Sequence, residues 1–341
     1  MPASSGSNED DERRRPLSAG RILRTYLTLT LLTTFASSFI WGINTLFLLD
    51  AGLSITEAFA ANAFFTVGQV LFEVPTGVVA DAFGRRISYL LGSATLIAST
   101  LLYLWLWQMN GPFWAWALVS MLLGLGFTFF SGATEAWLVD ALHATHYRGT
   151  LEGAFAKGQI AIGIAMLSGT VAGGVIAQAT NLGVPYILRT LVLGLTFLVA
   201  FVSMHDVGFI PAKHASVLQK TRSILTSSLD HGLRNPPVRW LMLAAPFGAG
   251  VGLYAFYAMQ PYLLQLYGHS DAYAIAGLAA AIVAGAQIVG GLIVPHLRKA
   301  FQRRTSLLRV GALTSAAALA VIGLAGFWLA LAALTLWAIV F

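Results

Sequence analysis

The sequence lacks cysteine altogether and has few charged residues. Only 10% of its 341 residues are charged, whereas 57% are hydrophobic and the mean hydropathy is +0.75. The lack of cysteine excludes disulfides and thiolate metal ligands, and it leaves the redox compartment open. So few charges cannot keep so much apolar surface in water. We therefore expect an all-α, polytopic membrane protein whose solvent is lipid.

Long apolar runs are what the sequence has in excess. About 20 apolar residues cross a bilayer as a helix. Ten runs are candidates, and the tenth ends before it reaches that length. They are 26–49, 57–80, 87–108, 113–139, 155–179, 184–203, 239–264, 272–295, 307–326 and 327–341. Short connections such as 108–112 predict antiparallel neighbours.

Basic residues predict the orientation of these spans. If the N-terminal tail is cytoplasmic, all 20 Lys and Arg residues except Arg189 lie in or beside cytoplasmic segments. Positive residues are retained on that side of a membrane. We therefore expect a multi-pass protein of the cell membrane with a cytoplasmic N-terminus. The net charge of +6 then suits lipid headgroups, and we expect no nucleic-acid partner.

The chain divides into four predicted parts. Residues 1–20 form a disordered cytoplasmic tail, 21–203 a six-helix bundle and 239–341 about four further helices. Between the bundles, 204–238 is either a linker with an amphipathic helix on the inner membrane surface or a solvated linker with chance periodicity. The Arg85-Arg86 pair recurs at Arg303-Arg304, which indicates a worn repeat of two halves.

The motif that best identifies the chain lies between the second and third spans. Residues 77–86 read GVVADAFGRR and follow Pro75. Glycines allow a sharp turn, the aspartate can accept hydrogen bonds at a helix end, and the arginines mark a boundary with water. The spacing G-x-x-x-D-x-x-G-R-R resembles the loop between the second and third helices of the major facilitator superfamily of transporters.

This resemblance implies a monomeric two-bundle carrier whose bundles rock about a central site. It implies a conformational latch in the loop, with Asp140 either pairing with its arginines or remaining an exposed interfacial acid. The latch residues would be Gly77, Asp81, Gly84, Arg85, Arg86 and Asp140. Members have twelve spans, so we expect that this chain lacks the last two helices and keep a truncated, inactive transporter as an alternative.

Two carboxylates within the spans are candidates for proton coupling. Glu73 lies in the second span and Glu135 in the fourth. Burial would favour the neutral form of each, as a reversible proton carrier requires. An equally simple reading is that each bonds a neighbouring helix or pairs with Lys157 or Arg148. No cofactor is expected, because a proton gradient would supply the energy.

The resemblance also places a substrate cavity among the first, fourth, seventh and tenth spans. Polar and aromatic residues of these spans suit a small amphiphilic or aromatic solute. Arg189 in the sixth span either extends to the headgroups or contacts an anionic substrate or a carboxylate. The cavity candidates are Trp41, Asn44, Glu135, Arg189, Tyr254, Tyr257 and Gln260. Most such aromatic residues serve packing or interface anchoring.

Export is the favoured direction of transport. Residues 169–174, GTVAGG, partly resemble the glycine-rich signature of antiporter members, although small residues also serve helix packing alone. Uptake or facilitated diffusion of a sugar or organic anion is the alternative. An intramembrane metal enzyme would need Asp140, His143 and His146, which spread over about 120 degrees of a helix. We expect neither a metal site nor an enzyme.

Overall fold

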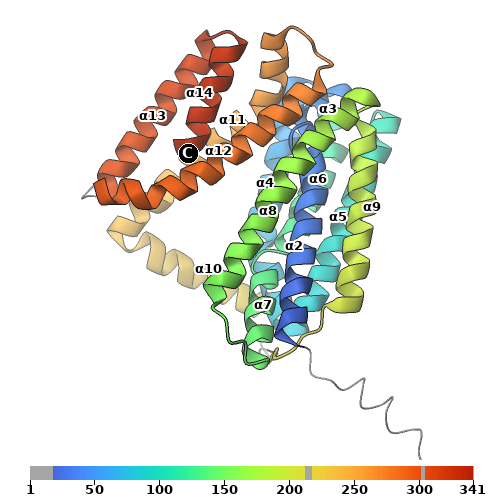
Figure 1. Ribbon diagram of the computed structural model, residues 1–341, viewed down its shortest axis with the longest axis vertical. Helices are drawn as coiled ribbons and strands as arrows, with labels where there is room; N and C mark the ends of the chain where they lie inside the picture. The colour runs from blue at the N-terminus through green and yellow to red at the C-terminus, as the bar shows by residue number, and fades with distance from the viewer. Residues whose placement is uncertain (1–17, 212–216, 301–303, 341) are drawn as a thin grey trace, which may run out of the picture.

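The computed structural model describes residues 18–211, 217–300 and 304–340, and these residues form helices and short connections without a strand (Figure 1). The predicted tail lies outside the described residues up to residue 17. Ser18 caps the first described helix, which begins at Ala19, so the end of that tail is helical. The apolar runs form helices as expected, and the all-α prediction is confirmed.

The N-terminal bundle contains eight helices. They are α2 (Ala19–Trp41), α3 (Asn44–Asp50), α4 (Ile55–Phe83), α5 (Arg85–Met109), α6 (Phe113–Thr128), α7 (Ala133–Ala144), α8 (Leu151–Ala179) and α9 (Gly183–Ser203). The helix α10 (Val217–Leu233) connects it to the C-terminal helices. These are α11 (Pro236–Tyr267), α12 (Tyr273–Ala300), α13 (Arg304–Leu324) and α14 (Phe327–Val340).

Most of the predicted spans correspond to single helices. Seven helical segments of the described chain are long and apolar enough to cross a membrane, and the bent pair α2 and α3 makes an eighth. Two shorter apolar helices, Leu308–Leu324 and Phe327–Val340, follow. Together these segments account for the ten expected spans, and the polytopic prediction is confirmed.

Two predicted spans are broken. The first bends by 47° between α2 and α3, where Gly42 lies so close to α12 that an added Cβ would be 2.9 Å from the Cα of Gly277. The fourth is interrupted at residues 129–132, between α6 and α7, where Gly132 has a φ of +67°. The apolar composition continues across both breaks, and each broken stretch is still a candidate for one membrane span.

Glycines allow the helices of the N-terminal bundle to pack closely. A Cβ at Gly68 of α4 would lie 2.3 Å from the carbonyl oxygen of Met121 in α6, and one at Gly173 of α8 would lie 1.9 Å from that of Phe39 in α2. Backbones in lipid approach in this way where side chains are small. Larger side chains at these positions would separate the helices.

The predicted linker helix is present as α10. It ends at Leu233, just before Asn235-Pro236-Pro237, as the proline pair predicts. The same pair also begins α11, since a proline in the first turn of a helix loses no backbone hydrogen bond. A location of α10 on a membrane surface stays a prediction.

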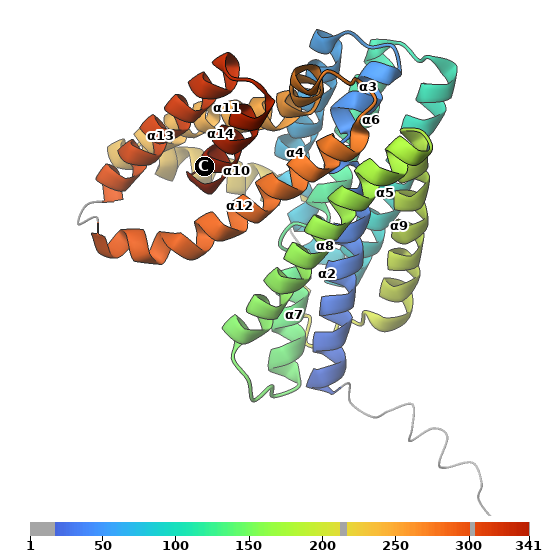
Figure 2. The same ribbon diagram turned by 45° about the horizontal axis from the view of Figure 1, so that its top comes forward.

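The two bundles meet near one end of the molecule. We call it the Asp50 end, after the last residue of α3, and the opposite end the Ala19 end. Figures 1 and 2 show α8, α12, α3 and α11 converging at the Asp50 end, whereas the bundles diverge towards the Ala19 end. The first half of α11 accordingly leaves Trp240 and Phe247 exposed.

Hydrogen bonds close the Asp50 end. Gln260 of α11 is 1% exposed; its side-chain oxygen accepts from the backbone N–H of Thr45 at 2.8 Å and its amide donates to the carbonyl of Trp41 at 2.9 Å. Gln178 of α8 accepts from the backbone N–H of Ala274 at 3.0 Å. We call the Gln260 contacts the Gln260 clamp. They occupy the backbone groups that the break between α2 and α3 leaves free.

Candidate functional site

The predicted latch loop is reduced to one residue. The helix α4 continues to Phe83 and α5 begins at Arg85, so Gly84 alone separates them. Its φ of +107° is open to glycine and disfavoured for other residues. Gly77 lies inside α4, with no atom within 4 Å of the position that a Cβ would take. The structure therefore needs a glycine at 84 and gives no steric reason for one at 77.

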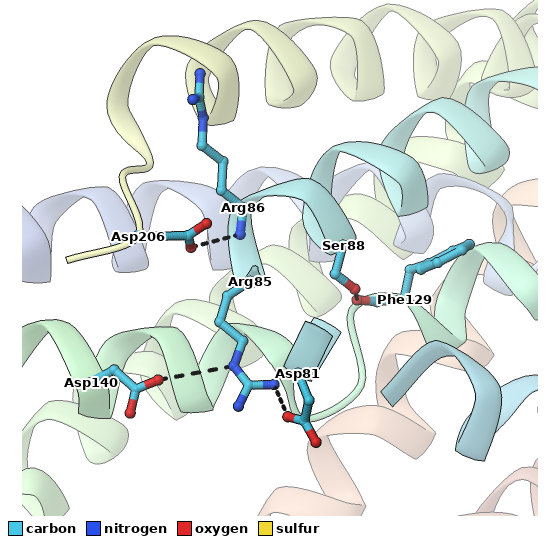
Figure 3. Close-up of polar contacts among 7 residues, drawn as sticks. All are labelled: Asp81, Arg85, Arg86, Ser88, Phe129, Asp140 and Asp206. Carbon is cyan, nitrogen blue, oxygen red and sulfur yellow. Dashed lines mark hydrogen bonds and ion pairs between the residues drawn. The ribbon is translucent and has the colours of Figure 1, made fainter. Parts of the chain in front are cut away.

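Arg85 lies between two carboxylates at this turn (Figure 3). Its Nη1 is 2.7 Å from Oδ1 of Asp81 in α4, and its Nε is 3.9 Å from Oδ2 of Asp140 in α7. These side chains are partly exposed, so each pair contributes about 1 kcal/mol at most. The arrangement joins α4, α5 and α7 at the Ala19 end.

Asp206 contacts the predicted latch residues, and the sequence analysis missed it. It follows α9, and its Oδ1 accepts from the backbone N–H of Arg86 at 2.9 Å, which satisfies a free donor at the start of α5 (Figure 3). The side chain of Arg86 extends away from the other carboxylates, and its guanidinium lies 5.2 Å from the centre of the Phe201 ring. The only sequence signal was a lone acid just after an apolar span.

These contacts all join parts of the N-terminal bundle and its exit segment. Ser88 of α5 adds a hydrogen bond of 2.8 Å to the carbonyl of Phe129, at the break between α6 and α7. Trp137 of α7 donates to the carbonyl of His205 at 2.8 Å. The described contacts fix the Ala19 end of this bundle as a unit. A role of these residues as a latch between conformations stays a prediction.

A central cavity of about 280 Å³ lies where the two bundles meet. Four of the predicted cavity residues, Trp41, Asn44, Arg189 and Tyr257, are on its wall. The other lining residues are aliphatic, aromatic or amide side chains: Ile40, Asn62, Phe65, Gln69, Tyr103, Leu123, Phe127 and Phe256. The site therefore combines a largely aromatic surface with three amides and one cation.

Three other predicted cavity residues lie elsewhere. Gln260 is buried in the clamp at the Asp50 end. Tyr254 is 63% exposed and lines a neighbouring hollow of about 470 Å³ between α4 and α11, which shares Asn62 and Tyr257 with the central cavity. Glu135 is an exposed residue of α7 and does not line the central cavity. The break between α6 and α7 separates Glu135 from the part of the fourth span that reaches the cavity.

An amide network organises one wall of this cavity. The hydroxyl of Tyr186 donates to Oδ1 of Asn44 at 2.8 Å, and Nδ2 of Asn44 donates to Oδ1 of Asn62 at 2.8 Å. Asn62 is 3% exposed and was not among the predicted residues. An amide inside an apolar span was the signal that could have found it. The network holds Asn44 at the bend between α2 and α3.

Arg189 is enclosed in the protein. Its side chain is fully buried, so extension to the headgroups does not occur in this structure. Nε donates to Oγ1 of Thr100 at 3.1 Å, and the guanidinium lies 5.8 Å from the centre of the Phe127 ring. Nη1 and Nη2 are buried without an acceptor among the described residues. An unpaired buried cation is costly, at several kcal/mol.

Comparison with known proteins decides the family. Residues 26–341 match the sequence model of the Major Facilitator Superfamily. The chain belongs to this superfamily. It is a multi-pass membrane transporter of small molecules, and the recognition made from the GVVADAFGRR motif is confirmed.

Solved transporter structures share the fold of this superfamily member. The nucleoside transporter NupG has a TM-score of 0.73 at 12% identity, with 94% of this chain and 78% of that chain covered. A D-xylose-proton symporter has a TM-score of 0.63 at 18% identity, with 94% of this chain and 79% of that chain covered. A bacterial homologue of the human lysosomal transporter Spinster, inward-facing and unoccupied, has a TM-score of 0.67 at 16% identity, with 94% of this chain and 73% of that chain covered. No curated protein matched.

The candidate proton carriers of this transporter lie outside its central cavity. Glu73 and Glu135 are both exposed, and the hydroxyl of Ser131 donates to Glu73. No ion pair with Arg148 or Lys157 occurs among the described residues. The expected enclosure is not found, since both side chains are exposed. In the described part, no three His, Cys, Asp or Glu side chains cluster as metal ligands.

Proposed function

We propose that this protein is a secondary transporter that exports a small organic molecule by alternating access, driven by protons. The observation that carries the proposal is the central cavity, whose wall is shared by both bundles, from Trp41 of α2 to Tyr257 of α11. A site at the junction of two mobile bundles can open to one side at a time.

The conformation is the one that an exporter would adopt before its substrate binds. If basic residues mark the cytoplasmic side, the Ala19 end is cytoplasmic and the Gln260 clamp closes the outer side. The bundles diverge towards the Ala19 end (Figure 2). A substrate would then enter from within the cell and leave once the clamp opens.

Proton coupling and direction have separate support. Glu135 is exposed on α7 towards the Ala19 end, where protons from that side can reach it. Protonation would remove a charge and so bias the equilibrium between the two conformations. The partial antiporter signature at 169–174 includes Gly174, which packs against Gly277 of the other bundle. Uptake or facilitated diffusion remains the competing mode.

The test is transport by the purified full chain in lipid vesicles. A thermal-shift screen of drugs, sugars, amino acids and organic anions selects a compound that stabilises the protein. We expect that compound to accumulate in inside-out vesicles with an acidic lumen, and the accumulation to collapse when a protonophore dissipates the gradient. If the compound accumulated to the same level without the proton gradient, the transport would not be coupled to protons. If the compound crossed the membrane in neither orientation of the vesicles, the proposal of a transporter for this compound would be wrong.

A further inference from the structure

Arg189 is the one charged residue among the described residues that line the central cavity. It is held on one edge by Thr100 and on one face by Phe127. The edge of its guanidinium that carries Nη1 and Nη2 is buried and has no acceptor in the described part of the chain. That edge is the planar fork that binds carboxylates in a bidentate manner.

We propose that the substrate is a small organic acid, with its carboxylate on Arg189 and an apolar, ring-containing body against the aromatic wall. This inference rests on the proposed function, since it names the substrate class of the same cavity. The charge of the acid would compensate the buried cation, and the unpaired fork is the feature that selects an anion.

The described protein offers no carboxylate for this role. Asp50, the acid at the closed end, accepts a hydrogen bond of 2.8 Å from Nε1 of Trp107. The latch carboxylates bond within the turn at the Ala19 end, and Glu135 is exposed away from the cavity. A carboxylate of a molecule that enters the cavity would supply this counter-charge.

The rest of the wall defines the body of the acid. Trp41, Tyr103, Phe127, Phe256 and Tyr257 present aromatic surface, which favours a ring over a polyhydroxylated chain. A volume of about 280 Å³ is at the small end for ligand sites and suits a single-ring compound. Amide groups on the wall can hydrogen-bond one further polar substituent.

The experiment compares acids with their uncharged amides. Purified full-length protein is titrated with benzoate, phenylacetate and indole-3-acetate, and with the primary amide of each, while thermal stability is recorded. We expect the acids to raise the unfolding temperature and the amides to have little effect. Arg189→Gln should weaken acid binding by about 10- to 100-fold, the loss expected for charge-assisted hydrogen bonds. Arg189→Lys, which keeps the charge, should bind more weakly than the parent and better than Arg189→Gln.

The control variant and the results that would contradict the inference are both measured by binding, independently of transport. Arg234→Gln removes an exposed cation of α10, paired at 3.4 Å with Asp230, and should leave binding unchanged. The inference would be overturned if the amides stabilised the protein as much as the acids do. It would also be overturned if none of the acids stabilised the protein. Acid binding that survives in both Arg189 variants would overturn it as well. If acids bind through Arg189 but do not cross vesicles, the proposed transport fails and the inference on ligand class holds.

Discussion

Asp206 stabilises the start of α5 from a position 120 residues away in the sequence. The helix has no side-chain cap of its own, because Gly84 occupies the cap position. A carboxylate at a helix N-terminus satisfies a free N–H and interacts favourably with the helix dipole. A single acid in the exit segment therefore ties the end of the six-span bundle to its most charged turn.

Replacing Asp206 with alanine should destabilise the protein by about 0.5–2 kcal/mol, the range for loss of a helix cap. The acceptor for the Arg86 N–H is lost while the turn itself is retained. The unfolding midpoint in detergent gives the readout. Asp271→Ala, at an exposed position at the Asp50 end, is the matched control. Equal midpoints for the two variants would show that the cap contributes nothing.

Single residues show where sequence reasoning stopped. Arg189 is conspicuous in the sequence as an ionisable residue in an apolar run, but whether it reaches the headgroups depends on helix rotation and on neighbours such as Thr100 and Phe127 from other helices. Asp206 was missed because its partner is remote in the chain. Gly84 was predictable, since a turn between two long helices that requires a positive φ favours glycine.

At the scale of elements, α8 and α12 form the closest junction between the bundles. A Cβ at Gly174 would lie 2.6 Å from the carbonyl oxygen of Tyr273 and 2.9 Å from the Cα of Gly277. Backbone atoms cannot move aside as flexible side chains do. The two helices therefore lie in contact near the Asp50 end only because both carry glycine there.

Gly174→Val should open this junction. Overpacking of such a contact costs about 1–3 kcal/mol, which would shift a two-state balance away from the conformation closed at the Asp50 end by about 5- to 150-fold. Because the chain contains no cysteine, spin labels at Leu49→Cys and Gln265→Cys report the separation of the bundles there. Gly194→Val, at a glycine with no atom within 4 Å of the added Cβ, is the control. Unchanged label distances would contradict the role of the junction.

The extents of the elements follow from apolar composition to within a few residues at most helix ends, because lipid imposes one length scale on every span. The breaks do not follow from it. The chain stays apolar through the bend between α2 and α3, and Gln260 of the other bundle bonds the backbone groups that the bend leaves free. Residues 77–83 read as part of a loop because they include Asp81, yet the helix continues to Phe83.

The whole molecule is closed at one end by contacts between backbones and fixed side chains, and the bundles diverge at the other (Figure 2). The Gln260 clamp and the α8–α12 junction both lie at the Asp50 end, so one rocking motion would break both. The predicted latch residues lie at the opposite end within a single bundle, where their contacts join α4, α5 and α7. Protonation at the Ala19 end would act on this balance from a distance.

Glu135→Gln should abolish most substrate-driven proton flux in reconstituted vesicles. The amide imitates the protonated carboxylate and cannot release a proton, so the protein would lose the charge change that distinguishes its conformations. Substrate binding should persist, because Glu135 does not line the cavity. Glu152→Gln, at an exposed acid in the first turn of α8, is the control and should retain the parent flux. Flux in the Glu135 variant equal to that of the control would exclude this residue as the proton carrier. Coupling would then have to be sought at Glu73, the other candidate proton carrier, through the corresponding Glu73→Gln variant.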